Sequence, residues 1–423
     1  MAEHVDAGTT LRGLQLLHLL RRRDFGLLWW GQVTSQMGDA LNKVALLWFV
    51  YELTGSPVKM TLIGLLQTIP PLVLGPVFGV YLDRLPKKTL MIAVDLARTF
   101  LVALIPILFA SDALTLERLY VLVFVISVVS TIFGPALIAT TPMLVNREHL
   151  LPANALLQAT NNIGFIVGPA LGGLGIALIG AQNVLYVDAA TFFVSAVCLM
   201  GIKARCTQSE AGSVAQTNLV EDIMAGFRFI FLEHRTLLVL VVISALYHLG
   251  VSAFIFLLPV YTKEHLQVGP VQLGWLWSAL GIGMLLTSVW LAATPPRGID
   301  DRLKTIGNAM AIGGIAICTL TVLQTTLIAV TLVIVIGSST AVFNPIASAL
   351  LQELTPAPLI GRVLTTFSTG AMASAMAGMA SFGWMTETAG PSTSLVALGM
   401  ILVLTAALII SYSRQSRLAS ART

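Results

Sequence analysis

Residues 79–88 read GVYLDRLPKK and form the junction between two long apolar runs, at 60–82 and 88–110. Either run can cross the hydrocarbon layer as a helix, because a layer of about 30 Å takes about 20 residues that rise about 1.5 Å each. The charged residues between the runs cannot lie in lipid without a large cost in free energy. This stretch therefore predicts a membrane hairpin whose connection lies in water.

The same pattern extends in both directions along the chain. Of the 423 residues, 56% are hydrophobic and only 10% are charged, whereas a soluble protein carries roughly 25% charged residues. Lipid must therefore surround most of the molecule, and the net charge of +4 gives no support to nucleic-acid binding. We predict an all-α membrane protein with twelve spans, at 28–51, 60–82, 88–110, 119–142, 155–179, 183–203, 237–261, 271–293, 306–324, 327–350, 362–386 and 392–412.

One long polar connection divides these spans into six and six. We predict an N-terminal bundle at 1–203, a cytoplasmic linker at 204–236 and a C-terminal bundle at 237–423, as in a duplicated transporter. The segment AGFRFIFLEHR at the end of the linker has apolar residues at helical spacing. It is either an amphipathic helix on the membrane surface or an extension of the seventh span.

The loops predict the orientation of the chain. If both termini are cytoplasmic, most lysines and arginines fall in cytoplasmic loops and tails, and the outer loops hold only Lys59, Arg118 and Lys263. Basic residues are concentrated in the cytoplasmic loops of membrane proteins. We therefore expect a multi-pass protein of the plasma membrane, the inner membrane of a cell that has two, with both termini in the cytoplasm.

The loop at 79–88 resembles the signature loop of the major facilitator superfamily. The resemblance rests on Gly79, the Asp83–Arg84 pair and the basic pair Lys87 and Lys88, while Pro86 departs from the usual small residue. It implies two pseudo-symmetric six-helix bundles. It also implies a cytoplasmic gate in which Asp83 caps the eleventh helix and bonds with nearby basic groups, in a network that we extend to Asp95, Arg98 and Arg362.

Span 5 contains GFIVGPALGG, which resembles the antiporter motif of drug-exporting members of that superfamily. Glycines four residues apart form a groove for a neighbouring helix, and a proline kinks a span. The alternative is that these residues serve packing alone. The residues concerned are Gly164, Gly168, Pro169, Gly172 and Gly173.

The start of the chain indicates one branch of the family. RRRDFGLLWWGQVTSQMGDAL resembles the macrolide-efflux-like and siderophore-exporter-like drug:proton antiporters in Asp24, Phe25, Ser35, Gly38 and Asp39. One element is missing, because span 4 lacks the Arg-x-x-x-Gly pattern of many proton-coupled exporters. Proton coupling must then use other groups, if it occurs.

Charges inside the spans are the candidates for those groups, because an intramembrane charge is costly and tends to be paired or functional. Asp39 and Lys43 are four residues apart on one helical face, so they can pair, and Asp39 is the first candidate for proton coupling. The alternative is a fixed structural pair. Asp95 and Arg98 are three residues apart in span 3, and we expect them to pair in a gating or structural network.

Two further titratable residues lie in spans 6 and 7. Asp188 is expected in an external gate or as the cap of its helix. His248 is a proton-coupling candidate because histidine titrates near neutral pH, although a lone buried histidine is more often only hydrogen-bonded.

Taken together, these features predict a proton-coupled exporter of small amphipathic or apolar compounds that works by alternating access. The alternative is a dedicated exporter of a native metabolite, such as a siderophore or a lipid. No nucleotide loop, zinc motif or G-x-S-x-G element occurs, so we expect no enzyme activity, cofactor or metal. The three cysteines are expected to be unpaired, and the protein to act as a monomer: Cys198, Cys206 and Cys318.

Overall fold

The computed structural model describes residues 19–82, 85–203, 228–230, 235–323, 325–356 and 359–420. Within these ranges the chain forms helices and turns, without a strand. It divides into two compact units, the first at 1–49 and 66–212 and the second at 50–65 and 213–423. The division after residue 212 lies inside the predicted linker. Most of that linker, with most of the predicted amphipathic segment, falls outside the described residues.

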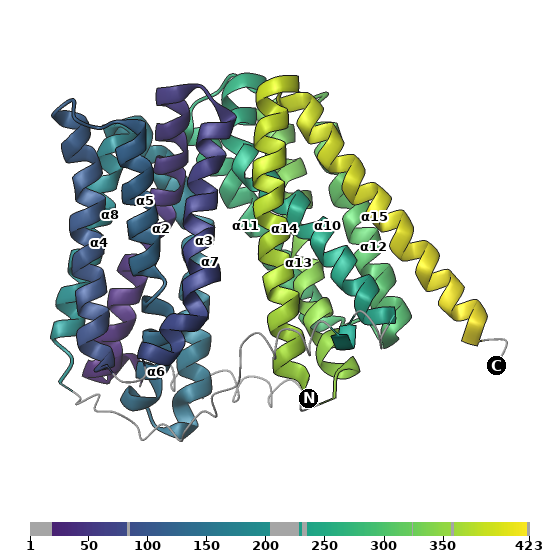
Figure 1. Cartoon of the computed structure of the whole chain (residues 1–423), viewed down its shortest axis with the longest axis horizontal. Coiled ribbons are helices and arrows are strands. Elements are labelled where there is room, and N and C mark those ends of the chain that lie inside the picture. The colour runs from purple at the N-terminus through teal and green to yellow at the C-terminus, as the bar shows by residue number, and fades with distance from the viewer. Residues whose placement is uncertain are drawn as a thin grey trace, which may run out of the picture. The chain divides into compact units, whose positions relative to one another are not determined.

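The helices of the first unit stand side by side (Figure 1). Two of them, α2 and α3, have one end each in the second unit, at residues 50–65. The short 3₁₀ helix Arg147–His149 precedes α7. The helices are α2 (Arg23–Thr54), α3 (Pro57–Leu82), α4 (Lys87–Ala110), α5 (Leu116–Ser130), α6 (Phe133–Leu144), α7 (Leu150–Ile179) and α8 (Ala181–Met200).

The second unit is also helical, and its described part has six α-helices, which Figure 1 shows with α15 inclined to the others. Its first helix continues into the π-helical turn η3 (Tyr261–His265). The pairs in closest association are α12 with α15, α11 with α13, and α10 with α14. The helices are α10 (Arg235–Val260), α11 (Pro270–Ala293), α12 (Gly298–Leu320), α13 (Thr326–Leu354), α14 (Ile360–Ala389) and α15 (Pro391–Ser420).

The helices confirm the predicted twelve spans, with one correction. Ten segments are long and apolar enough to cross a membrane, and α2 and α14 are the remaining long helices of the described chain. The predicted span 119–142 is not one continuous helix, because it breaks between α5 and α6 at Thr131 and Ile132. Pro135 accounts for the break, since proline lacks an amide proton and clashes with the carbonyl four residues earlier, that of Thr131.

Both units make the same turn between their last two helices. Gly180 ends α7 with φ 85° and ψ 152°, and Gly390 ends α14 with φ 87° and ψ 161°. Only glycine adopts this region of backbone space without strain. Each glycine amide also donates to the carbonyl four residues earlier, at Ile176 and Thr386. This shared turn is structural evidence of duplication where sequence similarity between the halves is faint.

Glycines at equivalent positions bring helices into close contact in both units. In the first unit Gly164, Gly168 and Gly172 of α7 face α2, where a Cβ at Gly168 would overlap that of Ala40. In the second, a Cβ at Gly378 of α14 would overlap the carbonyl of Leu249 in α10. Lipid provides no hydrophobic drive for helix association, so close van der Waals packing must supply it. The glycines of span 5 therefore form a groove, and α2 packs into it.

A second contact between helices is also repeated. The Ser127 hydroxyl of α5 donates to the carbonyl of Gln67 in α3 at 2.8 Å. The Ser338 hydroxyl of α13 donates to the carbonyl of Gly283 in α11 at 3.1 Å. Both units therefore join their second and fourth spans by a serine-to-backbone bond, which satisfies polar groups that lipid would leave without a partner.

Residues 50–65 are attached to the second unit by polar contacts. Glu387, near the end of α14, accepts hydrogen bonds from the Ser56 hydroxyl at 2.5 Å and from the Val58 amide at 3.2 Å. These donors lie at the start of α3, where the helix dipole favours a negative charge. The Tyr51 hydroxyl bonds to Glu264 in the same unit. Glu387 thus acts as an N-terminal cap for α3 from a distant part of the sequence.

We predict that Gly168→Ala lowers the stability of the purified protein by about 1–3 kcal/mol, because the new methyl group overpacks the contact with α2. Thermal unfolding in detergent measures the change. Gly370→Ala is the matched control, since a Cβ there meets nothing within 4 Å and alanine is the better helix former. Equal melting temperatures for the two variants would contradict the groove.

Candidate functional site

The first unit contains a cavity of about 310 Å³, within the size range of small-molecule sites. Side chains from α2, α3, α4 and α5 line it, and Phe192 of α8 completes the wall. Its lining combines apolar side chains with polar ones, and the polar side chains come from α2, α3, α4 and α5. Among the residues that the structure describes, no group of three or more His, Cys, Asp or Glu side chains could hold a metal ion.

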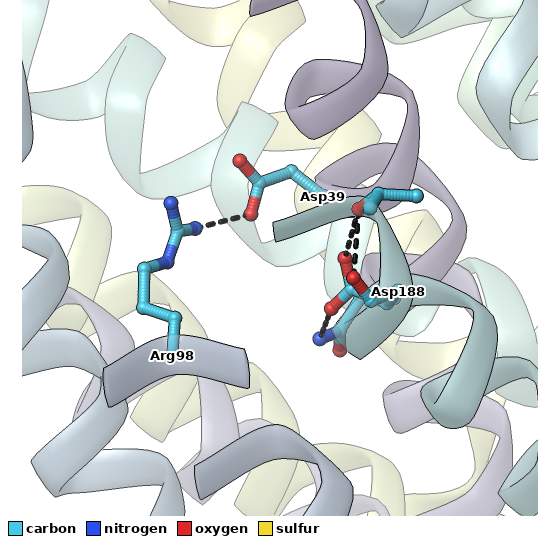
Figure 2. A network of polar contacts seen from close by, with 5 residues as sticks. Asp39, Arg98 and Asp188 are labelled. Atoms are coloured by element: carbon cyan, nitrogen blue, oxygen red, sulfur yellow. Dashed lines mark hydrogen bonds and ion pairs between the residues drawn. The ribbon is translucent and has the colours of Figure 1, made fainter. Parts of the chain in front are cut away.

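An ion pair crosses this cavity between two helices. Arg98 of α4 donates to the carboxylate of Asp39 in α2 at 2.5 Å (Figure 2). The Arg98 guanidinium also lies 3.7 Å from the centre of the Phe192 ring, a cation–π contact. The Asp39 side chain is 39% exposed and that of Arg98 only 9%. Arg98 is therefore held from two sides, while the carboxylate of Asp39 faces the cavity.

A second carboxylate lies behind the first. Asp188 of α8 is fully buried and accepts a hydrogen bond from the Asn42 amide of α2. Figure 2 shows Asp188 on the far side of Asp39 from Arg98, with its own contacts. Gly38 makes this approach feasible, since a Cβ there would overlap Thr191 and lie 2.5 Å from the Asp188 carboxylate. Asp188 lies well inside α8, so it does not cap the helix as one alternative predicted.

Asp95 is not paired with Arg98 as the spacing predicted. Arg98 reaches across to Asp39 instead, and neither carboxylate oxygen of Asp95 has a hydrogen-bond partner within the described part of the chain. The Asp95 side chain is 0% exposed. The reason for the difference is geometric, because a long arginine side chain can reach a neighbouring helix as readily as its own preceding turn.

The other two proton-coupling candidates lie in different surroundings. Lys43 lines the same cavity as Asp39, and its ammonium lies 5.8 Å from the centre of the Phe165 ring. His248 lies in the second unit, where its Nδ1 is 2.9 Å from the carbonyl of Ser244. It packs edge-on against Tyr247. These contacts are those of a buried, hydrogen-bonded histidine, the alternative considered for His248.

The signature loop is only partly described. Asp83 and Arg84 lie outside the described residues, and Gly79 lies in α3. The Lys88 ammonium donates to the carbonyls of Met200 and Ile202, at 3.2 and 2.5 Å. A cation at the carboxyl end of α8 is stabilised by the helix dipole. Lys87 is buried at the start of α4, and Arg362 lies in the first turn of α14.

The branch residues at the start of the chain are structural neighbours of this site. Asp24 accepts a hydrogen bond from the Lys203 amide at 3.0 Å, which joins the start of α2 to the end of α8. Phe25 and Ser35 are buried, as are Pro169 and Gly173 of the span 5 motif. The motif residues therefore position α2 between α7 and α8.

Sequence reasoning missed three members of the site: Asn42, Phe192 and Thr191. Asn42 had a usable signal, because it lies one helical turn after Asp39 in a long apolar run. Phe192 and Thr191 had none, since their roles depend on the rotation of α8. The cavity walls likewise could not be assigned from hydropathy.

The chain matches the family model described as transmembrane secretion effector over residues 16–421. It is 26% identical over 395 residues to the multidrug efflux pump Tap of Mycolicibacterium fortuitum, covering 89% of this chain and 93% of the relative. It is 23% identical over 343 residues to macrolide efflux protein A of Streptococcus pyogenes, covering 81% and 84%.

Solved transporter structures share the fold at low sequence identity. A bacterial homologue of the iron transporter ferroportin, in an inward-facing state, matches with a TM-score of 0.72 and 16% identity over 93% of this chain and 99% of that one. The nucleoside transporter NupG matches with 0.71 and 16%, over 91% and 98%. Identities this low establish the fold alone.

We predict that Asn42→Ala destabilises the protein by about 1–3 kcal/mol, because it removes the amide donor from the buried Asp188. Thermal unfolding in detergent measures the loss. Asn162→Ala is the control, since Asn162 makes an exposed bond with Gln158 at 3.2 Å. A change for Asn42→Ala no larger than that for Asn162→Ala would contradict the assignment.

Proposed function

This chain belongs to the transmembrane secretion effector family of the major facilitator superfamily, and from that premise we propose that it exports small amphipathic or apolar compounds by proton antiport. The family resemblance and the all-α fold predicted from the sequence are confirmed. The relatives are named efflux pumps, for multiple drugs in one case and macrolides in the other. Drug or antibiotic export by this chain is the proposal that follows.

The cavity supports an amphipathic substrate. Its walls carry Leu46, Pro71, Val102 and Ile105 beside polar side chains from four helices, α2, α3, α4 and α5. Apolar walls with a few polar groups bind the apolar body of a ligand and orient its polar end. A compound with one polar and one apolar part fits this surface better than a highly charged metabolite.

One observation carries the coupling proposal: the cavity-facing carboxylate of Asp39 is bonded to Arg98 of another helix. A proton on Asp39 removes its negative charge and releases the guanidinium. The contact between α2 and α4 would then depend on the state of one carboxyl group. Proton binding and helix packing are thereby coupled, which is what an antiporter requires.

The topology belongs to the same proposal. We place both termini in the cytoplasm and the protein in the plasma (inner) membrane, acting as a monomer, because the basic loops fall on one side of the twelve spans. The two bundles at 1–203 and 237–423, joined by the linker at 204–236, would rearrange during alternating access, with Asp83 in a cytoplasmic gate and Asp188 in an external one.

We predict that Asp39→Asn abolishes accumulation of a macrolide in everted membrane vesicles under an imposed pH gradient. The amide keeps the shape of the side chain but cannot carry a proton. Accumulation should fall to the level of vesicles that lack the protein, while the amount of protein in the membrane stays the same.

Glu353→Gln serves as the control, because Glu353 forms a partly exposed ion pair with Arg302 at 2.7 Å in the second unit. Such pairs contribute little, so transport should match that of the wild type. Gradient-driven accumulation by Asp39→Asn at the wild-type rate would remove Asp39 from the coupling step. Wild-type accumulation that ignores the pH gradient would remove proton antiport itself.

The orientation has a separate test. Alkaline phosphatase fused after Thr423 should be inactive, because the enzyme folds only outside the cytoplasm. The same enzyme inserted at Gly55, in the turn between α2 and α3, should be active. The reverse pattern would invert the topology.

A further inference from the structure

Arg98 has two carboxylates within reach and is bonded to only one of them. Asp39, on α2, holds the guanidinium at 2.5 Å. Asp95 lies three residues before Arg98 on α4, a spacing at which two side chains meet on one helical face. Both Asp95 oxygens and the Arg98 Nε are buried without a hydrogen-bond partner among the described residues. The site therefore holds an unused donor and an unused acceptor on the same helix.

Among the described residues, Arg98 is the one cation that acts on Asp95. The charged groups that act on it are Arg98 on its own helix and Asp39 on α2. The remaining charges of the cluster are Lys43 on α2, which lines the cavity, and Asp188 on α8, which is bonded to Asn42. The Ser195 hydroxyl of α8 is the polar group that faces Asp95, although no hydrogen bond of standard geometry joins the two side chains. A fully buried carboxylate with no bonded cation and no well-formed hydrogen bond is favoured in its protonated form.

We propose that Arg98 is a switch with two positions, paired either with Asp39 or with Asp95. The two carboxyl groups share one proton, which is held by the group that is not paired with Arg98. In the observed state Arg98 is bonded to Asp39 and the proton is on Asp95. In the other state the O–H bond of Asp95 has broken and the proton has formed a new O–H bond on Asp39. Arg98 is then bonded to the Asp95 carboxylate. The total charge of the three groups is the same in both states, so neither leaves an uncompensated charge in the membrane.

This inference makes Asp95 a second proton-carrying residue in the transport cycle, and in that respect it rests on the proposed antiport. Asp39 is open to the cavity and Asp95 is closed off from it. The switch would thus transfer a proton between the cavity and the interior of the α2, α4 and α8 cluster. The pairing itself can be tested without any transport.

The test is a mutant cycle on thermal unfolding of the purified protein. Asp39→Asn and Asp95→Asn should each be tolerated, because Arg98 keeps the other acid. The double variant leaves Arg98 without either, so its melting temperature should fall by roughly 5 °C or more beyond the sum of the single changes. Adding Arg98→Met should restore it. A double variant that cannot be purified counts as the same result if the triple variant can be.

The matched control is Asp39→Asn combined with Asp188→Asn, which leaves Asp95 available and should show no excess. Three results would each overturn the switch. The changes in melting temperature for Asp39→Asn and Asp95→Asn could be additive, Arg98→Met could fail to restore stability, or the control pair could show the same extra loss. Everted vesicles then test its role, since Asp95→Asn should lose macrolide accumulation driven by the pH gradient and keep downhill exchange. Gradient-driven accumulation at the wild-type rate would overturn that role. Wild-type transport that ignores the gradient would sink the proposed antiport, while the mutant cycle would still decide the pairing.

Discussion

Lipid neither donates hydrogen bonds nor compensates charge, and the interior of this protein follows from that constraint. The ion pair between Asp39 and Arg98 is its clearest result. It spans two helices, and the Phe192 ring covers the guanidinium. The neighbouring Asp188 is satisfied by Asn42, a neutral donor on the same helix as Asp39. Asp39, Arg98 and Asp188 therefore find their partners inside the protein, and α2 takes part in both contacts.

Close backbone packing is what brings these groups together. The glycines of α7 let α2 approach on one side, and Gly38 lets α8 approach on the other. A larger side chain at these positions would separate the helices and with them Asp188 from its donor. The glycine motif that resembles that of drug exporters thus has a structural role, and it acts on the helix that carries the coupling candidate. Packing and a functional role are compatible here, because the packing positions Asp39.

The two units use the same devices at equivalent places. Three features occur once in each unit. They are the turn glycine (Gly180 and Gly390), the serine bond to a backbone carbonyl (Ser127 and Ser338) and the close glycine contact between helices (Gly168 and Gly378). The pair of Asp39 and Arg98 has no counterpart in the described part of the second unit. The region of α10 that corresponds to Asp39 in α2 holds Tyr247 and His248 in an aromatic cluster. The duplicated framework has thus diverged, so that the buried ion pair described here belongs to the first unit.

The sequence by itself determined that lipid surrounds the protein, how many spans cross the membrane, which family the chain resembles and which residues are candidates for function. Apolar run length and charge placement depend only on local composition, which is why Asp39, Asp95, Arg98 and Asp188 could be identified as intramembrane charges. Hydropathy does not specify how each helix is rotated about its axis. Only the tertiary structure could therefore decide that Arg98 bonds Asp39 across helices and leaves Asp95 alone, that Asn42 serves Asp188, and that Phe192 closes the cavity.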